Sequence, residues 1–531
     1  MASQYVLQSA NTETKSDYTF EDKYYTRIVD NNNGQYNSNQ VTWNLSNLTT
    51  DNVFLSAKES SLEIPFVTQV TCDANLANNA DNLKGVVMKQ SFCSLVEAFS
   101  LSINRNNIVN FSDMQNLPVE FKLLSSFSED DLKIYGDSMN FAKHTESAQS
   151  YKAAEDALGL GESNMGTGNT ALGQKNKKLS YQPNALFSDS ANIVSAKKSH
   201  VVADNMAALK VVTYHWMAVI PLMFLHDVFD KLPLIKNPFM QLTCRIHSAS
   251  SSMTIATAAK YPHAAVVSRF NYNPVMMSGK LVPVAGDLYI NSGIGSVKNA
   301  AGAITQNALD QACYFNACLY KFNPDSEMKY ISNPSRKVSF LQTTPYVKLE
   351  SIAPGANINF QVINKLANIR GLLMITQIDS TTNGLATPVT AQDAATSMST
   401  LNSPYSASLN MVGTNWTGFN IKIGGVNHYK NNVDYGYDLY QQELVKSHSV
   451  NGGMFGGGLN SGLITETDYT NGPYGYIWVD LSRYSSETED NIPKSVYIVG
   501  RNNTQARVAV TAYLYYKDEF NIDVSTSEIA V

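Results

Sequence analysis

Residues 211–248 read VVTYHWMAVIPLMFLHDVFDKLPLIKNPFMQLTCRIHS, and this stretch indicates the fold more clearly than any other. Its first part, 211–222, alternates in polarity and is rich in β-branched and aromatic residues, which predicts a strand. Its last part, 234–248, is apolar and extended again, which predicts a return strand. The stretch therefore predicts two strands joined by a short connection.

The connection, residues 223–233, has a helical pattern. Phe224, Val228 and Phe229 fall on one face of a helix, and Pro233 ends it because proline cannot continue a helix. We expect this face to pack against a sandwich wall or a neighbouring protomer. A strand, a short helix and a return strand thus form one unit in a chain with few other helical patterns.

Length and composition favour a large, two-domain β-protein. A chain of 531 residues is too long for one compact core, so two domains are expected. Charged residues make up only 16%, well below the usual quarter. Abundant Asn, Ser and Thr with 29 Tyr and 21 Phe favour β-sandwiches with polar loops. So low a charge suits a protein that buries much of its surface against neighbours.

Charge and cysteine content limit the partners and the compartment. The net charge is −6, and the first twenty residues hold one Lys and no Arg, so we expect no direct binding to nucleic acid. The five cysteines predict reduced, buried thiols: Cys72, Cys93, Cys244, Cys313 and Cys318. No signal peptide is recognised at the N-terminus, and the longest apolar run, Met217–Leu225, is too short to span a bilayer.

The two halves of the chain present similar segments in the same order. The proposed pairs are Val41–Leu45 with Ile358–Val362, Ser61–Val67 with Gly371–Ile378, 98–103 with Trp416–Ile423, and 214–222 with Tyr474–Leu481. Ser495–Val499 and Ala506–Tyr516 follow as paired strands. The first half carries extra length, mostly in 126–205. The pattern predicts an internal repeat.

Strands of this length with turns every 8–12 residues indicate β-sandwiches, and eight antiparallel strands in two facing sheets make a jelly roll. We therefore predict an all-β fold of two tandem eight-stranded jelly rolls with short flanking helices and long surface loops. The first covers 21–290, with a long loop insertion at about 126–205, and the second covers 291–531. Residues 1–20 form an N-terminal arm. Gly159–Gly173 is expected to be an exposed loop because it has little to bury.

Three segments resemble those of a known family: RIVDNNNGQYNSNQVTWNLSNL at 27–48, SFCSLVEAFSLSINRNNIVN at 91–110 and ARVAVTAYLYYKDEFNIDVS at 506–525. Together with 211–248, they resemble the double jelly-roll major capsid proteins of the polinton-like virus and virophage type. The resemblance implies a structural protein of an icosahedral double-stranded DNA virus and no enzyme. It also implies a homotrimer that forms a pseudo-hexameric capsomer.

The same resemblance implies further partners and a location. The partners are neighbouring capsomers, penton proteins and minor capsid proteins. The location is the virion shell, with synthesis and assembly inside the host cell.

No catalytic, cofactor or metal site is predicted. Gly161–Gly168 is Gly-rich but lacks the Gly-Lys-Ser/Thr of a phosphate loop, and Cys313 with Cys318 has no second ligand pair for zinc. His226 and Asp227 accompany no nucleophile motif. The residues expected to act in packing or interfaces are Phe224, Val228, Phe229, Trp216, Tyr5 and Leu7.

Two other functions stay open at this point. One is a glycan-binding double β-sandwich, as in a lectin or a fibre, which a solvent-facing aromatic cluster with Asp or Asn ligands for calcium would favour. The other is a jelly-roll glycoside hydrolase, which would need a pair of carboxylates at a set separation. A stable trimer or larger particle would favour the capsid protein, and a monomer that responds to sugar would favour the lectin.

Overall fold

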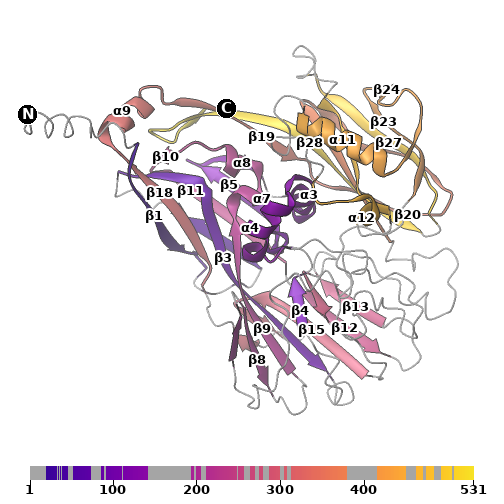
Figure 1. Ribbon diagram of the computed structural model, residues 1–531, viewed down its shortest axis with the longest axis horizontal. Coiled ribbons are helices and arrows are strands. Elements are labelled where there is room, and N and C mark those ends of the chain that lie inside the picture. The colour runs from indigo at the N-terminus through magenta and orange to yellow at the C-terminus, as the bar shows by residue number, and fades with distance from the viewer. Residues whose placement is uncertain are drawn as a thin grey trace, which may run out of the picture.

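The computed structural model describes residues 19–32, 34, 36, 39–45, 52–72, 85–88, 91–110, 112–141, 193–196, 199–204, 211–247, 249–255, 263–268, 274–278, 286–298, 304–307, 312–378, 415–449, 462–470, 474–482, 492–504 and 507–530. The fold is all-β, with antiparallel sheets and a few short helices (Figure 1). Tyr5, Leu7 and Gly159–Gly173 lie outside the described residues.

The first sandwich consists of two facing sheets. One sheet runs in the order β1 (Phe20–Val29), β18 (Tyr314–Phe322), β3 (Phe54–Cys72) and β9 (Val211–Pro221). The other runs in the order β2 (Gln40–Asn44), β11 (Met240–Ile246), β5 (Val96–Ile103) and β6 (Asn106–Val109). In chain order, these are strands one, eight, three and six facing strands two, seven, four and five.

The second sandwich repeats this order. One sheet holds β19 (Ser335–Thr343) with β20 (Val347–Ile352), then β28 (Val508–Asp523), β22 (Ile369–Ile378) and β26 (Ile477–Asp480). The other holds β21 (Asn357–Leu366), β27 (Lys494–Asn502), β23 (Trp416–Ile423) and β24 (Val426–Asn427), with β25 (Val433–Tyr435) also pairing β23.

Both sheet orders are those of a jelly roll, so the chain contains two of them in tandem. The predicted repeat is confirmed strand by strand. The segments paired from sequence are β2 with β21, β3 with β22, β5 with β23 and β9 with β26, and each pair holds the same place in its sandwich. An all-β double jelly roll is therefore the observed architecture.

The first sandwich extends beyond its predicted end at residue 290. Its eighth strand, β18, pairs with β1 from Phe20↔Phe322 to Val29↔Tyr314 and also pairs with β3. The chain reaches β18 only after an added group of strands: β12 (Ala249–Ile255), β13 (His263–Ser268), β14 (Val275–Ser278), β15 (Gly286–Ile294), β16 (Ser296–Lys298) and β17 (Ile304–Asn307). The expected boundary falls inside β15, which pairs with β3 of the first sandwich. The first sandwich ends instead at Phe322, the last residue of β18, because β18 pairs with β1.

The region from 126 to 205, predicted as a loop insertion, contains regular structure in its described parts. Helix α4 (Glu129–Met139) begins at Ser128, whose side chain and that of Asp131 form a capping box. At the far end, β7 (Ile193–Ala196) and β8 (Ser199–Asp204) extend the sheet beyond β9. Two smaller pairings, β4 (Gly85–Met88) with β14 and β10 (Ile235–Lys236) with β3, complete this sandwich.

The predicted single helix after β9 is two helices, α7 (Leu222–Leu225) and α8 (Asp227–Lys231). His226 lies between them in extended conformation, with φ −157° and ψ 147°, which ends α7. Its Nδ1 accepts a hydrogen bond from the Val228 amide at 3.2 Å, so the imidazole caps α8. A helical pattern alone does not reveal that a side chain competes for the backbone in this way.

The predicted pairing of 495–499 with 506–516 is also wrong. Residues 495–499 and 506–516 lie in β27 and β28, and these strands belong to opposite sheets of the second sandwich. The short connection between them suggests a hairpin, but in a jelly roll it crosses from one sheet to the other. A short β29 (Ile529–Ala530) pairs with the end of β28.

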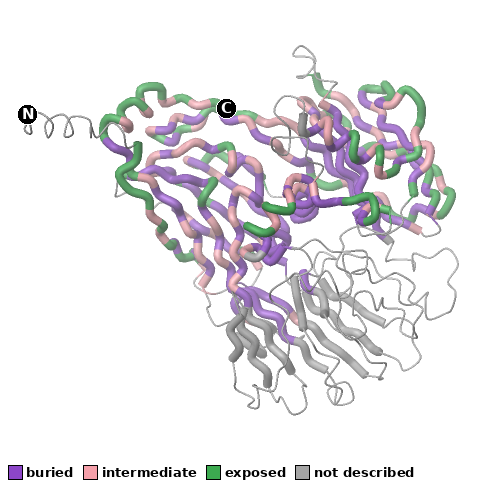
Figure 2. Tube along the Cα trace, in the orientation of Figure 1, coloured by how far each residue is buried: buried purple, intermediate pink, exposed green. Residues whose placement is uncertain are grey.

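The remaining helices were not predicted from sequence. They are η2 (Phe92–Leu95), α3 (Asn116–Ser126), α9 (Pro324–Ile331), α11 (Tyr437–Ser449) and α12 (Glu466–Thr470). α9 links the two sandwiches between β18 and β19, and α3 lies between the sandwiches (Figure 1). One continuous buried cluster of apolar residues runs through both sandwiches and across α3 (Figure 2).

Replacing Phe229 by alanine is expected to reduce the free energy of unfolding by about 3–5 kcal/mol, because the side chain is completely buried and its ring lies 5.9 Å from that of Phe99. Chemical denaturation measures this loss. Phe239→Ala, at a ring that is 37% exposed, is the matched control and should cost less than half as much. Equal losses would contradict the assignment of Phe229 to the core.

Candidate functional site

The junction between the two sandwiches is the candidate functional site, and α3 forms its centre. The sequence NLPVEFKLLSS is apolar on more than one side, and most of its residues are buried. Pro118 is tolerated because it lies in the first turn. The Phe121 ring lies 5.3 Å from Tyr476 and 5.4 Å from Trp478, both in the second sandwich. A helix that is apolar on more than one side needs a partner on each of those sides. For α3, the first sandwich is one partner and the second sandwich is the other.

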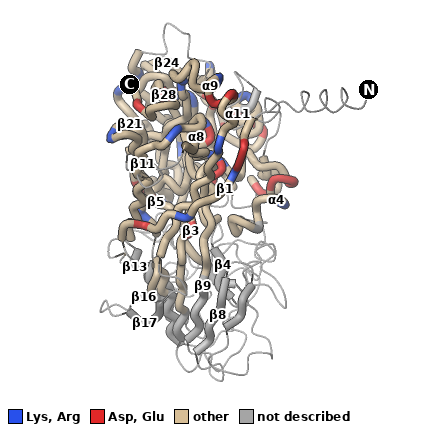
Figure 3. Tube along the Cα trace, turned by 90° about the vertical axis from the view of Figure 1, so that its left-hand side faces the viewer, with Lys and Arg blue, Asp and Glu red and all other residues tan. Residues whose placement is uncertain are grey.

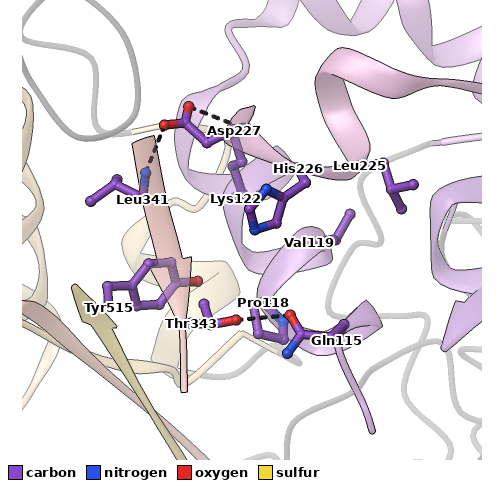
Figure 4. Close-up of a pocket in the computed structure, with 10 residues that line it drawn as sticks. All are labelled: Gln115, Pro118, Val119, Lys122, Leu225, His226, Asp227, Leu341, Thr343 and Tyr515. Carbon is purple, nitrogen blue, oxygen red and sulfur yellow. Dashed lines mark hydrogen bonds and ion pairs between the residues drawn. The ribbon is translucent and has the colours of Figure 1, made fainter. Parts of the chain in front are cut away.

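Hydrogen bonds across the junction join the loop and helices of the first sandwich to β19. The Leu341 amide donates to Asp227 Oδ2 at 3.0 Å (Figure 4). Thr343 Oγ1 donates to Gln115 Oε1 at 2.8 Å in the same view (Figure 4). Asp227 begins α8 and therefore also lies where a helix favours negative charge. The edge of β19 is thus covered from within the chain.

A second group of contacts joins the two ends of α3 to the second sandwich. Tyr513 Oη donates to the Met114 carbonyl at 2.8 Å, just before the helix. The Leu463 amide donates to the Leu124 carbonyl at 2.8 Å, in its last turn. Gly462 beside it has φ +77°, and a Cβ there would lie 2.4 Å from the Leu124 carbonyl oxygen. Only glycine fits this close approach without a shift in the backbone.

The C-terminal segment fastens the junction at its far end. The Lys236 amide donates to the Val524 carbonyl at 2.9 Å, and Ser527 Oγ donates to the Lys236 carbonyl at 2.7 Å. The Lys236 ammonium pairs with Glu327 of α9 at 2.7 Å. The sandwiches are therefore held at separated points, which restricts hinge motion between them.

A small cavity remains where α3, α7 and α8 meet β19 and β28. It has a volume of about 40 Å³ and is lined by Gln115, Pro118, Val119, Lys122, Leu225, His226, Asp227, Leu341, Thr343 and Tyr515 (Figure 4). A cavity of this size can hold a few water molecules, and it is far below the ~300 Å³ of an ordinary small-molecule site. Its small volume leaves no room for an organic ligand of ordinary size.

The charge state of this region is set by burial. Burial, with Lys122 as the second cause, lowers the pKa of His226 to about 3. The imidazole is therefore neutral at physiological pH, and its unprotonated Nδ1 caps α8. His247 at the end of β11 is also completely buried, and burial together with Arg245 lowers its pKa to about 3. Arg245 itself forms two hydrogen bonds of 2.8 Å with the buried Glu97.

The predicted packing residues lie in two places within the chain. Val228 and Phe229 are completely buried, and Phe224 contacts Phe127 and Tyr135 with ring separations of 5.1 and 5.3 Å. Trp216 is buried in β9, 6.1 Å from Phe66. The sequence singles out these residues because they sit on periodic patterns. It does not reveal α3 or Gly462, whose roles depend on contacts with distant segments.

The described residues contain no group of three or more His, Cys, Asp or Glu side chains that could hold a metal ion. Cys93, Cys244, Cys313 and Cys318 are buried free thiols, as predicted, and the side chain of Cys72, the fifth cysteine of that prediction, lies outside the described part of the structure. No helix in the described part of the chain is both long and apolar enough to cross a membrane.

No protein-family model matches the sequence, and no curated protein matches it. Solved structures are similar over nearly the whole chain. The crystal structure of the mavirus major capsid protein is 9% identical with a TM-score of 0.48, covering 98% of this chain and 93% of that chain. A chain of the Sputnik virophage structure is 12% identical with a TM-score of 0.46, covering 97% and 89%. The Faustovirus major capsid protein is 10% identical with a TM-score of 0.41, covering 94% and 90%. The sheet orders described above carry the fold assignment independently.

Gly462→Ala is expected to destabilise the protein more than Gly425→Ala. Both glycines have positive φ, +77° and +87°, so both variants carry a similar backbone strain of about 1–3 kcal/mol. Only at Gly462 does the added Cβ meet another segment, and we expect a further loss of about 1–3 kcal/mol there. Denaturant midpoints compare the two variants. Equal losses of stability in the two variants would show that the backbone near Leu124 shifts to make room for the added Cβ.

Stability should fall as pH falls from about 6.5 towards 3. The folded-state pKa of His226 is lower than its ordinary value of 6.5, so the unfolded chain binds the proton first and acid favours unfolding. Each such histidine contributes a slope of at most about 1.4 kcal/mol per pH unit in this window.

His226→Asn keeps a capping side chain at α8 and removes the titrating group. Unfolding by denaturant between pH 7.5 and pH 4 should give a shallower loss for this variant than for the parent. His247 continues to titrate in both proteins and serves as the internal reference. An unchanged slope would mean that His226 is protonated in the folded state.

Proposed function

We propose that this chain is the major capsid protein of an icosahedral double-stranded DNA virus, with a structural role rather than an enzymatic one. One observation carries the proposal: two sandwiches of identical strand order are held side by side in a single chain by a buried junction. Such a chain is a rigid block with two similar wall units. A protein built to tile a closed shell needs this property.

The proposed assembly unit is a homotrimer. Three chains around a threefold axis place six sandwiches in a ring, which gives a near-hexagonal capsomer. Closed symmetry satisfies the contacts within the trimer, and the outer sides of the ring then meet identical capsomers. Penton and minor capsid proteins would occupy the positions that a hexagonal block cannot fill. We place the division between the two units of each chain in α9, after Phe322.

Rigidity at the junction supports this role. If the two sandwiches turned relative to one another, three chains would not close on a fixed hexagonal outline. The junction combines ring packing around Phe121 with hydrogen bonds that Asp227 and Gln115 accept from β19. Packed cores of this kind have discrete arrangements rather than continuous ones.

Residues 1–20 are assigned to contacts between capsomers. The segment holds Tyr5 and Leu7 but no sustained periodicity, so it depends on a partner for burial. Its single Lys provides little to neutralise phosphate, and we infer no direct contact with the genome. In this account the protein acts in the virion shell and is made inside the host cell.

The purified protein should sediment with three times the chain mass of 58.3 kDa at micromolar concentration. Under assembly conditions it should form closed shells that pellet and are visible by negative-stain microscopy. A variant that lacks residues 1–16 should remain a trimer and form fewer shells. A monomer that gains mass only with added sugar would contradict the proposal and favour a lectin.

A further inference from the structure

The outer faces of the two equivalent sheets differ in one respect: one is covered and the other is open. In the second sandwich, Tyr513 and Tyr515 lie on the outer side of β28 and are buried against the helical side of the first sandwich. In the second sandwich Thr343 of β19 pairs with Tyr515 of β28. In the first sandwich Arg27 of β1 pairs with Asn316 of β18, so β1 and β18 hold the places of β19 and β28. On the matching face of the first sandwich, Tyr330 of α9 stacks on Phe322 at 5.0 Å, whereas Tyr25 and Val29 of β1 stay exposed in the described part of the chain.

The open face carries exposed apolar side chains beside its charged ones. Side chains of β1 alternate, so Lys23, Tyr25, Arg27 and Val29 point outward while Ile28 points into the core. Tyr25 is 59% exposed and Val29 is 51% exposed. Of the ten large apolar side chains that are exposed in the described part of the chain, β1 carries three, the third being Phe20. Such a concentration indicates a binding surface.

The charged residues on this face are already held in place. Lys23 pairs with Glu59 at 2.6 Å, and Arg27 pairs with Glu63 at 2.6 Å. The Arg27 guanidinium also lies 5.1 Å from the centre of the Tyr314 ring. Figure 3 shows residues of both signs along β1. Side chains fixed in this way lose little entropy when a partner binds, which favours docking.

Charged side chains on an edge strand ordinarily serve to prevent pairing with another strand. Lys23 and Arg27 can have this role, but Tyr25 and Val29 do nothing to prevent it. The combination therefore suits docking against the face of the sheet rather than addition of a strand. The neighbouring surface must then be formed by packed side chains, as it is at the internal junction.

The internal repeat identifies the occupant. Helix α3 follows strand five of the first sandwich, and α11 occupies the same place in the second. α3 is buried almost throughout because the second sandwich covers its far side. α11 instead packs against β26, where Glu443 accepts the Asp480 amide, and leaves Asp438, Gln441 and Gln442 exposed. The chain thus contains one junction in which two surfaces cover each other. Two further surfaces of the same kinds, the outer face of β1 and the exposed side of α11, do not meet within the described part of the chain.

We infer that the outer face of β1 and β18 docks the second sandwich of another copy of this chain, on the side that carries α11. The contact joins two different surfaces, so repeating it from chain to chain generates a ring when the rotation closes. This inference rests on the proposed capsomer and identifies the surfaces that hold it together.

The test compares two exposed valines. Val29→Glu introduces a charge on the docking face, and Val426→Glu introduces the same charge at a valine of the second sandwich that is 63% exposed and lies on β24. Sedimentation equilibrium of the full chain measures the dissociation constant of the oligomer. We expect Val29→Glu to raise it at least tenfold and Val426→Glu to leave it unchanged. Tyr25→Ala should weaken association in the same direction as Val29→Glu.

Thermal unfolding of each variant, measured at a concentration where all are dissociated, checks that the protomer still folds. A parent chain that is monomeric, a Val29→Glu variant that associates as the parent does, or equal dissociation of both glutamate variants would overturn the inference. Shell formation is scored separately. If shells form and Val29→Glu leaves the dissociation constant unchanged, only the docking face is refuted. If the oligomer depends on Val29 but shells never form, only the capsid role is refuted.

Discussion

The burial of α3 between two sheets is the interaction on which the rest of the structure depends. A helix with the sequence NLPVEFKLLSS is stable in water only when both of its sides are covered, and here each sandwich covers one. Phe121 packs on Tyr476 and Trp478, and hydrogen bonds at Met114 and Leu124 fix the two ends of the helix. The two jelly rolls consequently share one apolar cluster and form one block.

This constraint gives two similar units different surroundings. The outer face of β28 is committed to the internal junction, whereas the equivalent face on β18 and β1 keeps Tyr25 and Val29 in solvent. The duplication supplies a template for contacts between chains, because whatever covers one sheet has a counterpart that can cover the other. Proteins that form closed assemblies use such pairs of complementary but different surfaces. The neutral, buried His226 makes the same junction sensitive to acid.

Much of the fold could be predicted from the sequence, because alternation marks strands wherever they occur. The match between Val41–Leu45 and Ile358–Val362 predicted equivalent strands in the two sandwiches, and the structure confirms it. Contacts between distant segments could not be predicted. β18 completes a sheet begun by β1, α3 takes its conformation from burial on two sides, and His226 divides a helix through one hydrogen bond. Local pattern contains no information about these partners.

A three-dimensional reconstruction by cryo-electron microscopy of particles assembled from this chain tests the central claim most directly. The account predicts capsomers with a hexagonal outline and threefold symmetry, in which six sandwiches form the ring. It also predicts that α3 lies within each chain and that the outer face of β1 lies between chains. Capsomers built from six chains, or particles in which the face of β1 remains open to solvent, would contradict it.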